Sequence, residues 1–288
     1  MHLPKLNSLR GTSTAKAAAL LLLTLLPNFT PTRVNAQTEN IIFFDDFENY
    51  RAGTFPWDGG WDLVWYGVGP QYQVVTSDRY HSPTKSLQLL GKYGWSSVAE
   101  RRFTTTARVI GFEAYIMVEG QPLFKVTGLG SIGFWNREKA TWGKYYVDVA
   151  FMSDGYLAVH FIDDAGNDKV KELQPYTPGR WYKVKVVLDR SANTFSVWID
   201  DELKALNVKT ANTYDINALE VASAWGVVKC YFDDIKVFTV EEQSSPLPLF
   251  LLTPLGVISI IVAIALTLAL VYLHRKSQPP LPPPPPPP

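Results

Sequence analysis

Cysteine is almost absent from the sequence: Cys230 is the single one in 288 residues. One cysteine excludes an intrachain disulfide and a zinc site built from cysteines. The chain also lacks a basic run. All 27 acidic residues lie between Glu39 and Glu242, whereas 6 of the 27 basic residues lie outside that window, which leaves it a net charge of −6. Nucleic acid is therefore not the expected partner, because phosphate neutralisation needs clustered Lys and Arg.

One further absence concerns the source of the protein. After Asn28 the sequence contains no Asn-x-Ser/Thr glycosylation site. Extracellular proteins without disulfides or such sites are typical of prokaryotes. We therefore expect a prokaryotic surface protein and include an archaeon among the sources.

The first 36 residues have the pattern of a secretory signal peptide. Three basic residues, Lys5, Arg10 and Lys16, precede the apolar run 17–26, and Ala36 supplies a small residue before the expected mature start at Gln37. The apolar run is shorter than the roughly 20 residues that span a bilayer. An uncleaved N-terminal anchor is the alternative.

The C-terminal region contains the long hydrophobic run that the rest of the chain lacks. Residues 255–273 contain no charge, and 19 residues at 1.5 Å each reach about 28 Å, the thickness of a bilayer core. Arg275 and Lys276 follow directly and should remain cytoplasmic. We predict a linker at 244–253, a transmembrane helix at 254–273 and a large domain outside, in a single-pass plasma-membrane protein.

The tail, residues 274–288, combines that basic cluster with a proline tract broken only by Leu281. A proline tract forms an extended polyproline II rod without internal hydrogen bonds. Two interpretations remain open for this cytoplasmic segment: a stiff low-complexity tail, or a ligand for an aromatic groove.

Residues 37–243 contain no long helical period and are expected to form a β-sandwich. Short alternating runs bounded by Gly, Asp and Asn turns recur, and strands are predicted at 110–118, 145–152, 157–162, 181–188, 195–199 and 229–240. Runs of this kind indicate two packed antiparallel sheets rather than βαβ units. The domain is also rich in aromatic residues and contains all nine tryptophans.

Four segments carry a resemblance to a known family. Residues 179–189 followed by 195–201 resemble paired strands of concanavalin A-like, laminin G-like jelly rolls; residues 44–48 resemble the first strand of these domains, 82–89 an early strand and 231–237 the last. The resemblance covers about residues 42–240. It implies an all-β, two-sheet antiparallel jelly-roll sandwich.

The resemblance also implies a structural calcium ion. In this superfamily the first and last strands are usually neighbours, and their acidic residues often hold Ca²⁺. Here the corresponding residues are Asp45, Asp46, Glu48, Asp233 and Asp234. Clustered carboxylates repel one another unless a cation or a base compensates, and Ca²⁺ takes six to eight oxygen ligands. In the alternative, these carboxylates face water or pair with Arg or Lys.

Catalytic motifs are missing from the domain. Jelly-roll glucanases carry Glu-x-Asp-x-x-Glu on one strand, which this sequence lacks, and His81 and His160 lie in no lyase-like motif. Neither a Gly-x-Ser-x-Gly elbow nor a His-Glu-x-x-His helix occurs. These absences favour a non-catalytic protein.

Side chains outside the alternating core pattern are the candidates for ligand binding. Flat aromatic rings match the C–H face of a pyranose, and polar side chains fix its hydroxyls. The candidate ligand-binding residues are Trp135, Trp142, Tyr146, Asp148 and His160. For any one of them, core packing or edge protection is the alternative.

Together these features predict a cell-surface, non-catalytic carbohydrate-binding or adhesive module with a polysaccharide or glycoconjugate partner. Two alternatives stay open. One is a membrane-tethered glycosidase or polysaccharide lyase with an atypical site. The other is a structural envelope protein that binds a protein partner.

Overall fold

A computed structural model describes residues 37–120, 128–136, 138, 146–211, 213, 215–224, 228–242, 262, 264–270 and 272. Residues 37–243 form one compact unit. The expected signal peptide, the linker 244–253 and the tail 274–288 lie outside the described residues. Of the expected membrane-spanning segment 254–273, residues 262, 264–270 and 272 are described and are helical. Within the described part of the chain, no helix is both long enough and apolar enough to span a bilayer.

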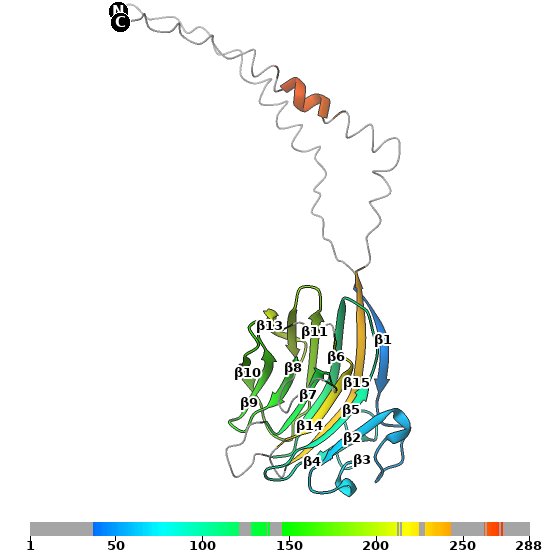
Figure 1. The fold of residues 1–288 in the computed structure, drawn as a ribbon. Coiled ribbons are helices and arrows are strands. Elements are labelled where there is room, and N and C mark those ends of the chain that lie inside the picture. The colour runs from blue at the N-terminus through cyan, green and yellow to red at the C-terminus, as the bar shows by residue number, and fades with distance from the viewer. Residues whose placement is uncertain are drawn as a thin grey trace, which may run out of the picture. The chain divides into compact units, whose positions relative to one another are not determined.

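The described residues of the domain form two antiparallel sheets that enclose one core (Figure 1). The eight-stranded sheet contains, in spatial order, β13 (Glu202–Lys209), β12 (Thr194–Ile199), β11 (Tyr182–Asp189), β6 (Val109–Val118), β15 (Lys229–Glu242), β4 (Ser86–Leu90) and β3 (Val74–Thr76), with β1 (Gln37–Asp45) also paired to β15. The seven-stranded sheet contains β10 (Asp168–Pro175), β9 (Tyr156–Ile162), β8 (Val147–Phe151), β7 (Gly130–Trp135), β14 (Ala218–Ser223), β5 (Ser97–Arg102) and β2 (Trp61–Tyr66). Two short 3₁₀ helices, η1 (Trp57–Gly59) and η2 (Pro70–Tyr72), lie in loops.

The fold confirms the expected all-β class and two-sheet sandwich. The predicted alternation is also correct on β11, where Tyr182, Val184, Val186 and Leu188 are buried in the core and the residues between them are partly exposed. Strand β1 pairs with the last strand, β15, as the resemblance implied. Because side chains alternate across a strand, each strand has a core face and an outer face.

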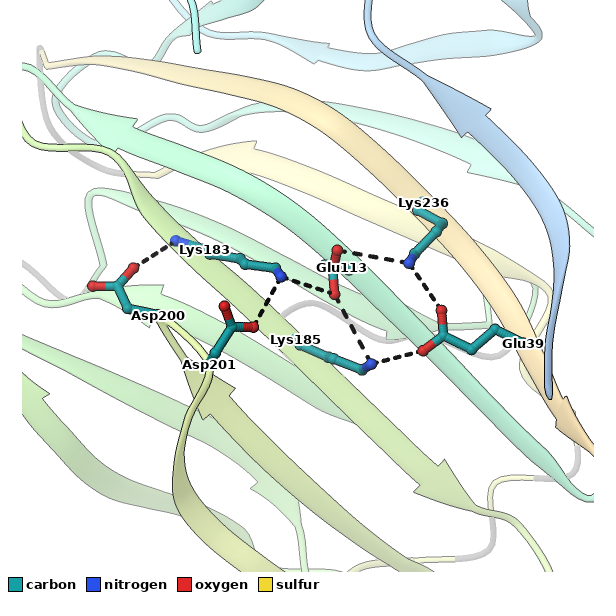
Figure 2. Close-up of polar contacts among 7 residues, drawn as sticks. All are labelled: Glu39, Glu113, Lys183, Lys185, Asp200, Asp201 and Lys236. Atoms are coloured by element: carbon teal, nitrogen blue, oxygen red, sulfur yellow. Dashed lines mark hydrogen bonds and ion pairs between the residues drawn. The ribbon is translucent and has the colours of Figure 1, made fainter. Parts of the chain in front are cut away.

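A charged network covers the outer face of the eight-stranded sheet across β1, β15, β6 and β11 (Figure 2). Glu39 accepts hydrogen bonds from Lys185 Nζ at 2.7 Å and Lys236 Nζ at 2.9 Å. Glu113 lies 3.6 Å from Lys183 Nζ and 3.6 Å from Lys236 Nζ. Burial raises the pKa of Glu39, but the two lysines outweigh burial and lower it overall. The network therefore stabilises this strand order above the ordinary carboxyl pKa and loses that effect as the pH falls.

A second polar centre, at the end of β1, connects the two sheets. The buried Asp45 carboxylate accepts hydrogen bonds from Trp61 Nε1 on β2 at 2.8 Å and from Arg101 on β5 at 3.2 Å. The Tyr50 hydroxyl at 2.8 Å and the Phe47 amide at 3.0 Å complete the set. Burial and the bond to Asp45 raise the pKa of Tyr50. These four hydrogen bonds compensate for the free-energy cost of removing the carboxylate from water.

We expect Asp45→Ala to lower the free energy of unfolding by about 3 kcal/mol, because it leaves a buried indole N–H and a partly buried guanidinium without their acceptor. Chemical denaturation measures this change. The matched control is Asp46→Ala, which removes one 3.1 Å bond to the Glu48 amide and should cost less than about 1 kcal/mol. Equal effects of the two variants would contradict the role given to Asp45.

Candidate functional site

Three of the five candidate ligand-binding residues lie on the outer face of the seven-stranded sheet. Asp148 on β8 pairs directly with His160 on β9. Trp135 is the last residue of β7 and is 6% exposed, so it does not form an open platform. Trp142 lies outside the described residues.

Tyr146 is tied to the domain rather than free for a ligand. Its hydroxyl donates to Asp215 Oδ1 at 2.5 Å, and its ring packs against the core. Burial, with the bond to Asp215, raises the pKa of Tyr146. Its described contacts therefore indicate a structural role.

Strand register places Asp148 and His160 in a line of residues that crosses the sheet. Each member is the direct partner of the next, and we call this line the central row: His160, Asp148, Gly133, Glu220, Glu100 and Asp62. It runs from β9 to β2, at about 4.8 Å per strand. Carboxylates from four strands that are distant in sequence therefore share one face.

Glu100 and Glu220, the two central carboxylates, were not among the residues expected from the sequence to bind a ligand. They are 0% and 1% exposed. Arg102, two residues along β5, lies 3.2 Å from Glu100. One signal in the sequence could have identified Glu220, which stands inside the otherwise apolar run Ala218–Ser223. A charge at the centre of a buried strand has to be compensated, so such a residue is a candidate for a site.

Gly133 separates Glu220 from Asp148 in the central row. A Cβ at this position would lie 2.6 Å from the Val147 carbonyl oxygen and 2.8 Å from Asp148 Cα. Any larger residue would therefore push β7 away from β8. The glycine leaves the row without a side chain between the two carboxylates.

A line of small side chains runs beside the central row on the same outer face. Ala222, Ser131, Ala150 and Ala158 pair successively from β14 to β9. Small residues let a bound group approach the sheet backbone closely. On the outer face, a strip of small side chains therefore lies beside the polar side chains of the central row.

Asp148 is the most strongly perturbed member of the central row. It is 5% exposed, and its Oδ1 atom has no hydrogen-bond partner among the described residues. Burial raises its pKa to about 7, although a hydrogen bond with Ser131 opposes the shift. A carboxyl group with such a pKa exchanges its proton near neutrality, as general acids and bases do.

His160, at the end of the central row, is mainly neutral at pH 7. Burial lowers its pKa, and the charge of Asp168 opposes the shift only in part. Its Nε2 atom lies 3.2 Å from Met152 Sδ. The imidazole therefore contributes a polar but uncharged group.

The acidic residues that the resemblance assigned to calcium lie in three separate hydrogen-bonded places. Asp45 belongs to the inter-sheet centre described above, and Asp46 accepts a hydrogen bond from the Glu48 amide. Glu48 accepts hydrogen bonds from the Thr84 amide and hydroxyl and from the Lys85 amide. Hydrogen-bond donors of the protein thus already contact the carboxylates of Asp45, Asp46 and Glu48.

The carboxylates of the last strand are used in the same way. Asp233 accepts the amides of His81 at 2.8 Å and Ser82 at 3.0 Å, and Asp234 contacts His81 Nδ1 and the Ser82 hydroxyl. Burial raises the pKa of Asp233 to about 7. No group of three or more His, Cys, Asp or Glu in the described residues is arranged to hold a metal. These residues do not fit one calcium cage, and calcium binding stays a prediction.

Comparisons with known proteins show the fold. No family model and no curated protein sequence matches the chain. Similar solved structures include a sialidase, at 14% identity and a TM-score of 0.51, where the match covers 71% of this chain and 18% of the sialidase. A carbohydrate esterase from the Shiga toxin-encoding bacteriophage phi24B matches at 14% identity and a TM-score of 0.49, covering 70% of this chain and 99% of the esterase.

The carbohydrate recognition domain of Emp47p is a third similar structure, at 11% identity and a TM-score of 0.46, with 70% of this chain and 96% of that domain covered. The match with the sialidase described above spans less than a fifth of that protein's length. At 14% identity the likeness to the sialidase shows the fold alone and leaves the activity to be argued from the residues.

We expect Asp148→Asn to change how stability depends on pH. The pKa of Asp148 in the folded protein, about 7, is above its ordinary value of 3.8, so between these pH values the folded state keeps a proton that the unfolded state loses. The unfolding free energy of the wild type therefore falls as the pH rises from about 4 to 7. The variant should remove up to about 1 kcal/mol per pH unit of that fall. Denaturation at pH 4 to 8 measures it, and parallel curves for the two proteins would contradict it.

Proposed function

We propose that the chain is a carbohydrate-binding module whose binding surface is the outer face of the seven-stranded sheet. The observation that carries the proposal is the central row, which lines up Asp148, Glu220 and Glu100 beside a floor of small residues. Carboxylates accept hydrogen bonds from neighbouring sugar hydroxyls, and such bonds to charged acceptors are among the strong ones. The small residues beside them keep the side chains short next to the carboxylates.

The charge of the central row favours one class of sugar. It contains the acidic residues Asp62, Glu100, Glu220 and Asp148. Glu100 pairs with Arg102, and Glu100 and Glu220 both have interactions of their own within the protein. A uronic or sialic acid brought to these carboxylates meets like-charge repulsion. We therefore propose neutral sugars or amino sugars as ligands.

The proposed setting follows from the sequence. A signal peptide at 1–36 and a helix at 254–273 would hold residues 37–243 on the outer side of a plasma membrane, with the proline-rich tail in the cytoplasm. A tethered module of this kind attaches a cell to a polysaccharide or glycoconjugate.

A glycan array and calorimetry with the full-length chain test the binding proposal. We expect neutral or amino-sugar oligosaccharides to bind, and Glu220→Gln and Asp148→Ala to weaken binding at least tenfold because each removes an acceptor from the central row. The control is Asp164→Asn, an exposed turn residue, which should leave affinity unchanged. Binding that none of the central-row variants alters would contradict the proposal.

A glycosidase is the second candidate function, because the register supports it. Glu100 and Glu220 are direct partners on β5 and β14, and opposed Cβ atoms lie about 4.5–5.5 Å apart. Retaining glycosidases hold their two carboxyl groups about 5–5.5 Å apart. Asp148 adds a group whose pKa suits proton transfer.

A reducing-sugar assay separates the two functions. We expect the binding module to release no reducing ends from any oligosaccharide that it binds. Release that Glu220→Gln abolishes, while the variant still unfolds like the wild type, would instead establish the glycosidase. Release that Glu220→Gln does not change would point to a contaminating enzyme.

A further inference from the structure

Exposed aromatic side chains gather on two loops at one end of the sandwich. The first loop runs from Tyr66, the last residue of β2, to Gln73 and carries Tyr66, Val68 and Tyr72 at 49%, 42% and 40% exposure. The second, residues 91–96, carries Tyr93 and Trp95 at 73% and 43%. We call these five residues the aromatic end. Large exposed apolar groups in a folded protein mark interaction sites when they occur together.

Backbone hydrogen bonds hold the two loops against each other. The Gly67 amide donates to the Ser96 carbonyl at 3.1 Å, and the Val68 amide donates to the Leu90 carbonyl at 3.3 Å. Gly67 has φ +55, and a Cβ there would overlap the Leu90 carbonyl oxygen. Only glycine therefore permits this approach of the loops.

A buried glutamine fixes the same loops from inside. Gln73 is 0% exposed, and its Nε2 atom donates to the carbonyls of Tyr66 at 2.8 Å, Gly69 at 3.1 Å and Leu90 at 3.1 Å. Its Oε1 atom accepts from the Leu90 amide at 2.8 Å and the Ser97 hydroxyl at 2.6 Å. Because an amide NH₂ has two hydrogens, two of the three carbonyls share one of them. These contacts rigidify the backbone that presents the aromatic rings, and a rigid site loses less conformational entropy on binding.

The composition of the two loops indicates the chemistry of the ligand. Neither loop contains Asp or Glu, and Lys92 is the one charged residue in the two segments. The exposed rings are Tyr and Trp, which combine an apolar face with a polar atom, and Val68 is the one large aliphatic side chain of the aromatic end. An uncharged ligand with both C–H faces and hydroxyls matches this surface. The single lysine provides little attraction for an anionic membrane.

The aromatic end lies far from the point where the chain enters and leaves the domain. Strand β15 begins beside Leu90, where Lys229 pairs with it, and ends where Glu242 pairs with Gln37 (Figure 1). The two loops are therefore at the opposite end of β15 from both termini of the domain.

We propose that the aromatic end is a second binding site, which holds a neutral saccharide by stacking the rings of Trp95, Tyr93 and Tyr66 on pyranose faces. The site is separate from the central row, which binds through carboxylates. It adds a contact to the proposed function but does not depend on it.

Calorimetry with the full-length chain and three probes, cellohexaose, mannohexaose and N-acetylchitohexaose, tests the second site. We expect two binding events for at least one probe. Trp95→Ala and Tyr93→Ala should each weaken one event at least tenfold, and Asp148→Ala should weaken the other. The matched control is Trp57→Ala, which removes a ring that is 55% exposed outside the aromatic end and should change neither event.

Each other outcome overturns the inference in an identifiable way. If the aromatic-end variants bind every probe like the wild type, the second site is wrong whatever Asp148→Ala does. If Asp148→Ala alone changes binding, the proposed function stands and this inference fails. If Trp95→Ala instead abolishes binding to neutral phosphatidylcholine vesicles, or self-association in sedimentation, while no probe binds, the occupant is a membrane or a second copy.

Discussion

The contact between Asp45 and its four donors is the interaction on which the rest of the domain depends. Strand β1 belongs to the eight-stranded sheet, whereas Trp61 and Arg101 belong to the seven-stranded sheet. Most contacts between the sheets are apolar and lack direction. A buried carboxylate with directed hydrogen bonds to both an indole and a guanidinium fixes how one sheet lies on the other.

This contact also positions one edge of the candidate site. Arg101 and Glu100 are neighbours on β5, so Arg101 contacts Asp45 between the sheets and Glu100 lies on the outer face. On β2, Trp61 likewise contacts Asp45 between the sheets, and its neighbour Asp62 lies on the outer face beside Glu100. The alternation of side chains along two short strands thus couples the inter-sheet contact to the carboxylates of the central row.

Much of the fold was predictable because its signal is local. Alternation gave the core face of β11 and placed Asp148 and His160 on a common outer face, and the pairing of β1 with β15 followed from the resemblance. The central row was not predictable in the same way. Glu100 and Glu220 are 120 positions apart, and only the register of β5 with β14 brings them together. Register is a long-range property that no single segment encodes.

For the acidic residues of the first and last strands, the sequence did not reveal which groups compensate their charge. A carboxylate can be compensated by a cation or by N–H donors, and sequence does not distinguish these. The amides and side chains of residues 81–85 contact Glu48 on one side and Asp233 and Asp234 on the other. A loop distant from both strands supplied the donors, so the ligand environment depended on a contact that no motif recorded.

Strand β15 has a mechanical consequence. Its 14 residues extend about 45 Å from the neighbourhood of the aromatic end to the last residue of the domain, and it pairs along its length with β6, β1 and β4. A pulling force applied between a ligand at that end and residue 243 runs parallel to this strand. Its ladder bonds are then loaded together in shear, not opened one after another as in unzipping. This interior strand of the eight-stranded sheet is therefore also the element that would carry tension through the domain.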